Sequence, residues 1–218
     1  MEPPGIVVLD LDGVVIKSNL IKYRVMLSLF AGVPERHEAI STFILANGGV
    51  PRRAKIAAIL EAILDTVATP PLVSEYLARY AIELEHALAT APLVEGVAEL
   101  LARSEHKFYL SSSAPEGEVG RQLARTGLLK YFSAVFGSDT PKANALREVK
   151  RRHLGSKPVF FGDSVGDLRA AQEARVAFVA VVNERDNFTD DEVIKITDFS
   201  SFQLVQTRIR EALRQNAT

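Results

Sequence analysis

Residues 6–13 read IVVLDLDG, four apolar residues that run directly into a segment with two acidic residues and a glycine. An apolar run that does not alternate with polar residues is typical of a strand buried on both faces, as in a parallel sheet covered by helices. Glycine allows the chain to turn sharply after such a strand. We therefore expect Asp10 and Asp12 to lie at the carboxyl edge of a buried parallel sheet.

Four more short apolar runs share this character, and segments with helical periodicity separate them. The expected strands are residues 6–9, 108–110, 134–136, 159–161 and 178–182. The expected helices of this part of the chain are residues 96–104, 118–125, 142–153, 167–174 and 202–214. Alternation of strands and helices predicts an α/β domain with a doubly wound parallel sheet.

The segment from residue 18 to residue 91 has the apolar spacing of helices throughout and lacks strand-like runs. Turns rich in glycine and proline divide it at residues 32–34, 47–51 and 70–71. We interpret this segment, 18–91, as an all-α cap subdomain. It would be inserted into an α/β core that comprises residues 1–17 and 92–218.

The composition excludes several classes of protein. The 218 residues hold 26 Lys and Arg against 27 Asp and Glu, whereas a nucleic-acid-binding protein is usually basic overall or along one face. The absence of cysteine excludes disulfides, thiol catalysis and cysteine-ligated metals. No apolar stretch approaches the roughly 20 residues of a membrane span, and the first residues lack a basic targeting cluster. We expect a cytoplasmic monomer or homodimer without nucleic-acid or membrane partners.

Residues that can carry chemistry follow four of the expected strands. They are Asp10 and Asp12 after the first, the serines 111–113 after the second, Lys142 after the third, and Asp163 and Asp167 after the fourth. Ligands of an open parallel sheet bind beyond the carboxyl ends of its strands, so these groups should converge. Carboxylates gathered there would repel one another unless a cation neutralises them, and an oxygen-only donor set suits Mg²⁺. Hydroxyl, backbone N–H and ammonium groups suit a phosphate, and the whole set indicates phosphoryl transfer.

In their order along the chain, these motifs resemble those of the haloacid dehalogenase superfamily. More narrowly, they resemble its phosphatase branch, with a helical cap between the first two motifs, the group of phosphoglycolate phosphatase and beta-phosphoglucomutase. The resemblance covers essentially the whole chain. It rests on Asp10-Leu11-Asp12-Gly13-Val14, Ser112, Lys142 and Gly162-Asp163-Ser164-Val165-Gly166-Asp167.

The resemblance implies roles for five residues that handle the phosphoryl group. Asp10 matches the nucleophile that becomes an aspartyl-phosphate, and Asp12 matches the general acid that later activates water. Ser112 and the N–H of Ser113 would hold the phosphoryl group, and Lys142 would neutralise its charge. Ser111 stays an alternative to Ser112, which we favour because its Ser-x-x-Pro spacing resembles the phosphate loop of the family.

The resemblance also implies a Mg²⁺ site. The ion would be held by the Asp10 carboxylate, the Asp12 backbone carbonyl and the Asp163 carboxylate. Asp167 would either ligate the ion directly or tune it without touching it. A purely structural interpretation also exists, because Asp163 or Ser164 could simply cap the helix that follows.

The segment Asn47–Lys55 combines a glycine-rich turn with closely spaced cations. One interpretation is a plain connection between two helices. The other is a loop that offers Arg52 and Arg53, with Lys22 of the first cap helix, to an anionic substrate.

The function we predict is Mg²⁺-dependent hydrolysis of a phosphomonoester, with a small phosphorylated metabolite as substrate. Asp12 argues against dehalogenases and phosphonate hydrolases, since the resemblance implies that they lack an acid at this position. A sugar phosphomutase, which shares all the motifs, is one alternative. A non-catalytic binding protein with the same fold is another, although the complete acidic set disfavours it.

Overall fold

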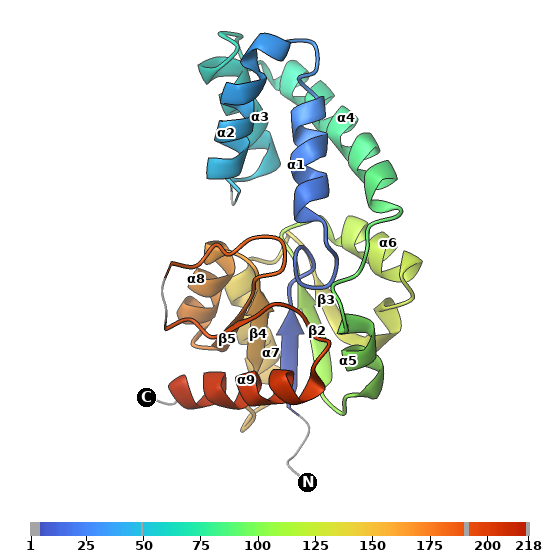
Figure 1. The fold of residues 1–218 in the computed structure, drawn as a ribbon, viewed down its shortest axis with the longest axis vertical. Coiled ribbons are helices and arrows are strands. Elements are labelled where there is room, and N and C mark those ends of the chain that lie inside the picture. Colours follow the sequence, from blue (N-terminus) through green and yellow to red (C-terminus); the bar gives the residue numbers. More distant parts are fainter. Residues whose placement is uncertain (1–4, 49, 190–191, 217–218) are drawn as a thin grey trace. The chain divides into compact units, whose positions relative to one another are not determined.

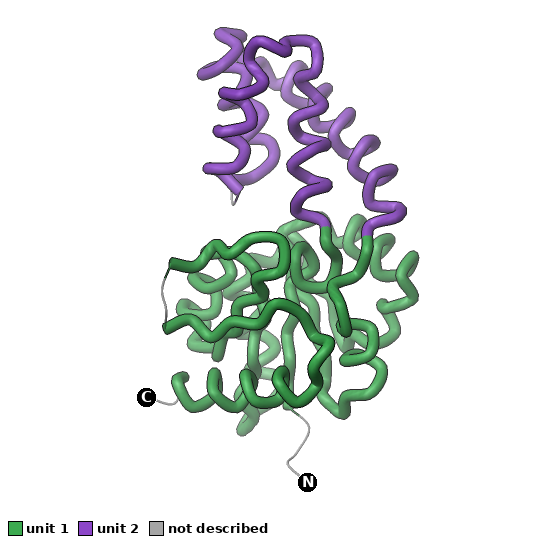
Figure 2. Tube along the Cα trace, viewed as in Figure 1, with its two compact units in different colours: residues 1–17, 92–218 green, residues 18–91 purple. Residues whose placement is uncertain are grey.

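The computed structural model describes residues 5–48, 50–189 and 192–216. Residues 1–4, used above to argue against a targeting segment, and Gly49 of the expected turn at 47–51 lie outside the described residues. The chain divides into two compact units (Figure 2). One comprises Met1–Lys17 and Pro92–Thr218, and the other comprises Ser18–Ala91.

The larger unit is built on a sheet that has six strands in the described part of the chain. The strands are β1 (Ile6–Leu9), β2 (Lys107–Ser111), β3 (Phe132–Phe136), β4 (Val159–Gly162), β5 (Ala177–Val181) and β6 (Lys195–Ile196). Their spatial order is β3-β2-β1-β4-β5-β6, and all neighbours are parallel. β1 is therefore central, with β2 on one side and β4 on the other.

Helices cover both faces of this sheet (Figure 1). They are α5 (Val97–Arg103), α6 (Glu116–Arg125), α7 (Lys142–Arg152), α8 (Val165–Ala174) and α9 (Phe202–Gln215). Ile6 and Val8 of β1 pack in one apolar cluster with residues of α7 and α8. The alternate residues Val7 and Leu9 are equally buried and point to the other face, on which α9 packs against β4 and β5. The expected doubly wound α/β architecture is confirmed.

The observed elements differ from the expected ones in small ways that have local causes. β6 was not expected, because a strand of two residues carries too little pattern to be recognised. β3 begins at Phe132 rather than at residue 134, since Ser133 interrupts the apolar run. α8 begins at Val165 rather than at residue 167, because Ser164 caps it.

The smaller unit is helical in all its regular elements among the described residues. It contains α1 (Asn19–Ser28), α2 (His37–Ala46), α3 (Arg52–Ala62) and α4 (Pro70–Leu88), with a 3₁₀ turn at Pro34–Arg36. Thr69 begins α4 by accepting a hydrogen bond from the Leu72 N–H, and prolines occupy the first helical positions, where no N–H is needed. Apolar residues of all four helices form a core of its own, which includes Met26, Ile40, Ile59 and Leu84.

Two short segments of the larger unit lie side by side where the chain leaves it and returns. The Lys17 N–H donates to the Pro92 carbonyl at 2.9 Å, and the Val94 N–H donates to the Val15 carbonyl at 3.0 Å. Lys17 also forms an ion pair with Glu95 at 2.6 Å. Among the residues that the structure describes, no helix combines the length and apolar character needed to cross a membrane.

Candidate active site

Asp10 lies at the carboxyl end of the central strand. Its N–H donates to the Phe161 carbonyl of β4 at 2.9 Å, which extends the ladder by one residue beyond β1. Its Oδ1 accepts a hydrogen bond from the Leu11 N–H at 2.8 Å. Only 4% of Asp10 is exposed, because strands flank it on both sides and helices cover both faces. The backbone therefore holds a buried carboxylate in one orientation.

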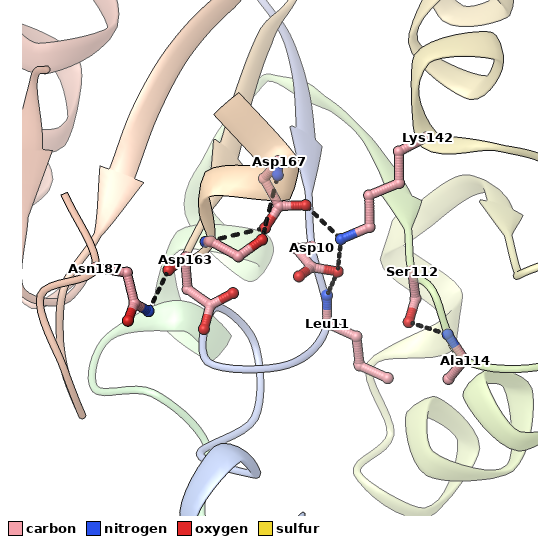
Figure 3. Close-up of polar contacts among 9 residues, drawn as sticks. Asp10, Leu11, Ser112, Ala114, Lys142, Asp163, Asp167 and Asn187 are labelled. Carbon is pink, nitrogen blue, oxygen red and sulfur yellow. Dashed lines mark hydrogen bonds and ion pairs between the residues drawn. The ribbon is translucent and has the colours of Figure 1, made fainter. Parts of the chain in front are cut away.

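Asp163 and Asp167 follow the neighbouring strand β4 and reach the same place (Figure 3). One carboxylate oxygen from each of Asp10, Asp163 and Asp167 lies within 4.8 Å of the others. Asp10 and Asp167 are buried, whereas Asp163 is half-buried. The structure thus brings together three of the four expected carboxylates.

The start of α8 fixes the position of Asp167. Ser164 Oγ accepts from the Asp167 N–H at 3.2 Å, and Asp167 Oδ2 accepts from the Ser164 N–H at 3.1 Å and from its hydroxyl at 2.7 Å. This reciprocal pattern is a capping box. Gly162 is required here, since a Cβ at that position would lie 2.4 Å from the Asp167 Cβ. Ser164, rather than Asp163, is therefore the helix cap.

Lys142, the first residue of α7, supplies the positive charge of the cluster. Its Nζ lies 2.9 Å from Asp10 Oδ1 and 2.5 Å from Asp167 Oδ1. Burial alone would lower the pKa of the Lys142 ammonium, but the charges of Asp10 and Asp167 outweigh it and hold that pKa above its ordinary value. Lys142 is therefore a permanent cation between two carboxylates.

The pKa of Asp10 is raised well above its ordinary value. Burial is the main cause, Lys142 opposes it, and the charges of Asp167, Asp163 and Asp12 add to it. The half-buried Asp12 therefore lies close enough to the cluster to act on it electrostatically. One ammonium does not compensate this group of acids, so the cluster has the electrostatics of a cation site.

The serines after β2 adopt three different environments. Ser112 is buried, its N–H donates to the Phe136 carbonyl, and its Oγ accepts from the Ala114 N–H at 3.1 Å. In Figure 3 its hydroxyl lies on the side of Asp10 away from Asp163, in agreement with the strand order β2-β1-β4. Ser111 is fully buried and its Oγ has no hydrogen-bond partner among the described residues, whereas Ser113 is exposed. This arrangement favours Ser112 over Ser111 as the hydroxyl that faces a ligand.

Comparison with known proteins agrees with this geometry. Residues 7–181 match the family model described as haloacid dehalogenase-like hydrolase. The chain belongs to this family. The matched span includes all the acidic residues, serines and the lysine of the cluster.

Solved structures of this hydrolase fold resemble the chain over almost its whole length. A predicted phosphoglycolate phosphatase from Haemophilus somnus has a TM-score of 0.75 at 17% identity, covering 94% of this chain and 99% of that one. A protein provisionally assigned as a beta-phosphoglucomutase, from Thermotoga maritima, has a TM-score of 0.70 at 20% identity, with the same coverage. The protein YfnB from Bacillus subtilis, described as a magnesium-bound HAD hydrolase, has a TM-score of 0.70 at 15% identity, covering 94% of this chain and 100% of that one. These identities establish the fold alone, and no curated protein sequence matches the chain.

The acidic cluster of this haloacid dehalogenase-like hydrolase has the donor atoms that a hard divalent cation needs. Its donors are carboxylate oxygens, with no sulfur or imidazole, which suits Mg²⁺. Within the described residues, the hydrogen bond and ion pair of the Asp10 carboxylate both go to Oδ1, so Oδ2 is available as a donor. Both oxygens of Asp167 are engaged, one by Lys142 and one by Ser164.

The cap candidates Lys22, Arg52 and Arg53 belong to the smaller unit of this hydrolase. Arg52 is half-buried, with its guanidinium 5.2 Å from the centre of the Tyr80 ring, whereas Arg53 is exposed. Lys55, the last residue of the segment Asn47–Lys55, is only 8% exposed and donates to the Gly48 carbonyl at 3.4 Å. Burial lowers the pKa of Lys55, and the charges of Lys22 and Arg52 lower it further.

We call Lys22, Arg52 and Lys55 the cap cation cluster. The three residues lie close enough for their charges to act on one another, although they come from two helices, α1 and α3. The spacing of Arg52 and Lys55, three residues apart on one helix, was the available signal that they share a face.

The sequence analysis missed two residues of the larger unit, Asn183 and Asn187. They contact the segments that carry Asp12 and Asp163.

Proposed function

We propose that this protein is a Mg²⁺-dependent phosphomonoester hydrolase that acts on a small phosphorylated metabolite. The observation that carries the proposal is the contact of Lys142 with Asp10 at the end of the central strand, beside Asp163 and Asp167. A buried carboxylate that faces an ammonium and further acids is suited to receive a phosphoryl group, whose negative charge needs cations around it. Membership of the hydrolase family supports the same class of reaction.

The reaction we propose has two transfers. In the first, a carboxylate oxygen of Asp10 attacks phosphorus, the bond to the ester oxygen breaks, and Asp12 gives that oxygen its proton. In the second, Asp12 takes a proton from a water molecule as the water oxygen attacks the aspartyl-phosphate. This step releases inorganic phosphate and restores the Asp10 carboxylate and the protonated form of Asp12.

Three groups would bind the phosphoryl oxygens during both transfers. Lys142 would neutralise their charge, while the Ser112 hydroxyl and the Ser113 N–H would donate hydrogen bonds. The contact of Lys142 with Asp10 supports its role, because it puts the ammonium beside the nucleophile in advance. A preorganised donor of this kind needs no rearrangement as the negative charge develops.

The proposed Mg²⁺ ligands are the Asp10 carboxylate, the Asp12 backbone carbonyl and the Asp163 carboxylate. When bound, the ion supplies positive charge that offsets both the acidic cluster and the phosphoryl group. Asp167 would act indirectly, because its two oxygens already accept hydrogen bonds from Lys142 and Ser164. Its effect on the reaction would then be transmitted through the position of Lys142.

The unit Ser18–Ala91 is in our proposal the cap that selects the substrate. The cap cation cluster would recognise a second anionic group of that metabolite, such as a carboxylate. The Lys55 ammonium supports this, because its burial and the nearby charges of Lys22 and Arg52 disfavour its charged form, which a bound anion would stabilise. Arg53 is exposed and stays a weaker candidate for the same task. The cytoplasmic location and the monomeric or homodimeric state remain predictions.

The test is a screen of phosphorylated metabolites for release of inorganic phosphate, with and without Mg²⁺, for the wild type and the Asp10→Asn variant. We expect release that requires both Mg²⁺ and Asp10. The phosphomutase alternative predicts isomerised hexose phosphate without stoichiometric phosphate release. A binding protein predicts no turnover of any compound, including a generic aryl phosphate.

A further inference from the structure

We propose that Asn183 and Asn187 are positioning residues for two different parts of the active site. Both lie in the segment that follows β5, residues 182–189, which we call the β5 loop. Asn183 would hold the turn that carries Asp12, and Asn187 would hold the segment that carries Asp163. The inference rests on the proposed function for its kinetic part, whereas its metal-binding part can be tested without turnover.

Asn183 contacts the turn after β1. Its side-chain Nδ2 donates a hydrogen bond to the Gly13 carbonyl, across 170 positions of sequence. Gly13 has a left-handed backbone with φ of 71°, and its N–H donates to the Ile16 carbonyl at 2.8 Å. Both polar groups of Gly13 are therefore engaged, one by the turn itself and one by Asn183. Because Gly13 directly follows Asp12, these bonds restrict where the Asp12 carboxyl can lie.

The second polar atom of Asn183 is also informative. Its Oδ1 is buried and has no hydrogen-bond partner among the described residues. Buried amide oxygens are nearly always paired, so this atom is an acceptor for a donor beyond the described residues, such as a water molecule.

Asn187 contacts the segment after β4. Its Nδ2 donates to the Asp163 carbonyl at 2.9 Å (Figure 3). Gly162, the residue before Asp163, pairs with Ala180 in the sheet, and Ser164, the residue after it, caps α8. The Asp163 backbone is therefore held on both sides by secondary structure and at its own carbonyl by Asn187. This fixes the direction in which its carboxylate leaves the chain.

The β5 loop is anchored well enough to serve as a fixed support. Asp186 accepts from the Phe188 N–H at 2.9 Å and forms an ion pair with Lys195 of β6, also at 2.9 Å. Lys195 in addition donates to the Phe188 carbonyl at 2.9 Å. The Phe188 side chain is buried, with its ring 5.8 Å from that of Phe178 in β5. Replacing a residue that holds a metal ligand in position commonly changes metal affinity or activity about 10- to 100-fold.

The two asparagines should affect different steps. The proton that Asp12 donates matters most when the leaving group is a poor one, such as an alkoxide, and least for an activated phenolate. We therefore expect Asn183→Ala to lower kcat/KM about tenfold or more for an alkyl phosphate and less than about threefold for p-nitrophenyl phosphate. Both rates are measured at saturating Mg²⁺, because the Asp12 backbone carbonyl is a proposed Mg²⁺ ligand and a displaced turn would also weaken binding of the ion.

Asn187→Ala should have the opposite signature. Isothermal titration calorimetry with Mg²⁺ alone should show a dissociation constant raised about 10- to 100-fold. At saturating Mg²⁺, the ratio of the rates for the alkyl and aryl phosphates should equal that of the wild type. The variants Asn183→Leu and Asn187→Leu have a side chain of similar branching, remove the donor without a cavity or an added charge, and should reproduce both results. Asn216→Ala is the matched control, an exposed asparagine that also donates to a backbone carbonyl.

Two results would overturn the proposal. One is an equal loss for both phosphates in Asn183→Leu, and the other is an unchanged Mg²⁺ dissociation constant in Asn187→Leu, each in a variant whose circular dichroism spectrum matches the wild type. If the wild type hydrolyses no phosphomonoester, the proposed function fails by itself. The titration of the Asn187 variants with Mg²⁺ would in that case still test whether Asn187 positions Asp163.

Discussion

Lys142 and Asp167 form an ion pair in the acidic cluster, with Nζ 2.5 Å from Oδ1. The other oxygen of the same carboxylate accepts from Ser164 at the start of α8. Asp167 therefore connects the N-termini of two helices, α7 and α8, which pack against each other along one face of the sheet. In this arrangement a helix cap determines where the ammonium beside Asp10 lies. The structural and the proposed catalytic interpretations of Asp167 are thus compatible.

Replacing Asp10 by asparagine should abolish turnover and leave the fold intact. The amide is nearly isosteric but cannot form an acyl-phosphate. The measurement is phosphate release at saturating Mg²⁺, with circular dichroism to confirm folding. Asp65→Asn serves as a control, because Asp65 is exposed and its left-handed backbone tolerates asparagine well. Turnover of Asp10→Asn within tenfold of the wild type would show that Asp10 is not the nucleophile.

Replacing Lys142 by methionine should destabilise the protein as well as inactivate it. The variant keeps the volume of the side chain but leaves the buried carboxylates of Asp10 and Asp167 without their cation. Removing one partner of a buried ion pair typically costs about 3–5 kcal/mol of unfolding free energy. Urea denaturation at neutral pH in Mg²⁺-free buffer measures this loss. The control Lys157→Met, at an exposed position, should change the free energy by less than about 0.5 kcal/mol.

The cap cation cluster should determine which metabolite is the preferred substrate. Losing a contact between a guanidinium and a charged group costs about 1.5–3 kcal/mol, so Arg52→Ala should lower kcat/KM for that metabolite roughly 10- to 100-fold. Hydrolysis of a small aryl phosphate, which has no second anion, should hardly change. Arg53→Ala is the internal comparison, since Arg53 is exposed and next in sequence. Unchanged kcat/KM for the metabolite in both variants would mean that specificity lies elsewhere.

His106 should make the stability of the larger unit depend on pH. Its Nδ1 accepts from the Gly5 N–H at 2.9 Å, and burial lowers the pKa of the ring below its ordinary value of 6.5. As pH falls below about 6.5, the unfolded chain therefore takes up a proton that the folded chain still rejects. The contribution of His106 to the unfolding free energy should therefore decrease between pH 7.5 and pH 5.5, which urea titrations of the wild type and His106→Gln at both values can measure.

Substitutions of single histidines can show whether this pH dependence comes from His106. In His106→Gln, lowering the pH from 7.5 to 5.5 should cost less unfolding free energy than in the wild type. In His86→Gln, at an exposed position on α4, the change with pH should equal that of the wild type. The slope should not vanish in His106→Gln, because burial also lowers the pKa of His153. A slope that is the same in His106→Gln as in the wild type would contradict the assignment.

Much of the fold was predictable because its signals are local. Continuous apolar runs such as 159–161 mark strands covered on both faces, and the loss of such runs between residues 18 and 91 marks helices. The convergence of Asp10, Lys142 and Asp167 was also predictable, since parallel strands end at one edge of a sheet. The two-residue strand β6 was not, because it exists only through its pairing with β5.

The sequence by itself determined the family, the doubly wound core and the acidic cluster, because strand pattern and motif order depend on neighbours along the chain. Only the tertiary structure decided how these groups are held. It paired Lys142 with Asp167 across 25 positions, brought Lys55 close enough to Lys22 for their charges to interact, and brought Asn183 to Gly13 across 170 positions. Such contacts leave no local pattern, since burial and charge act between residues that meet only after the sheet and helices have packed.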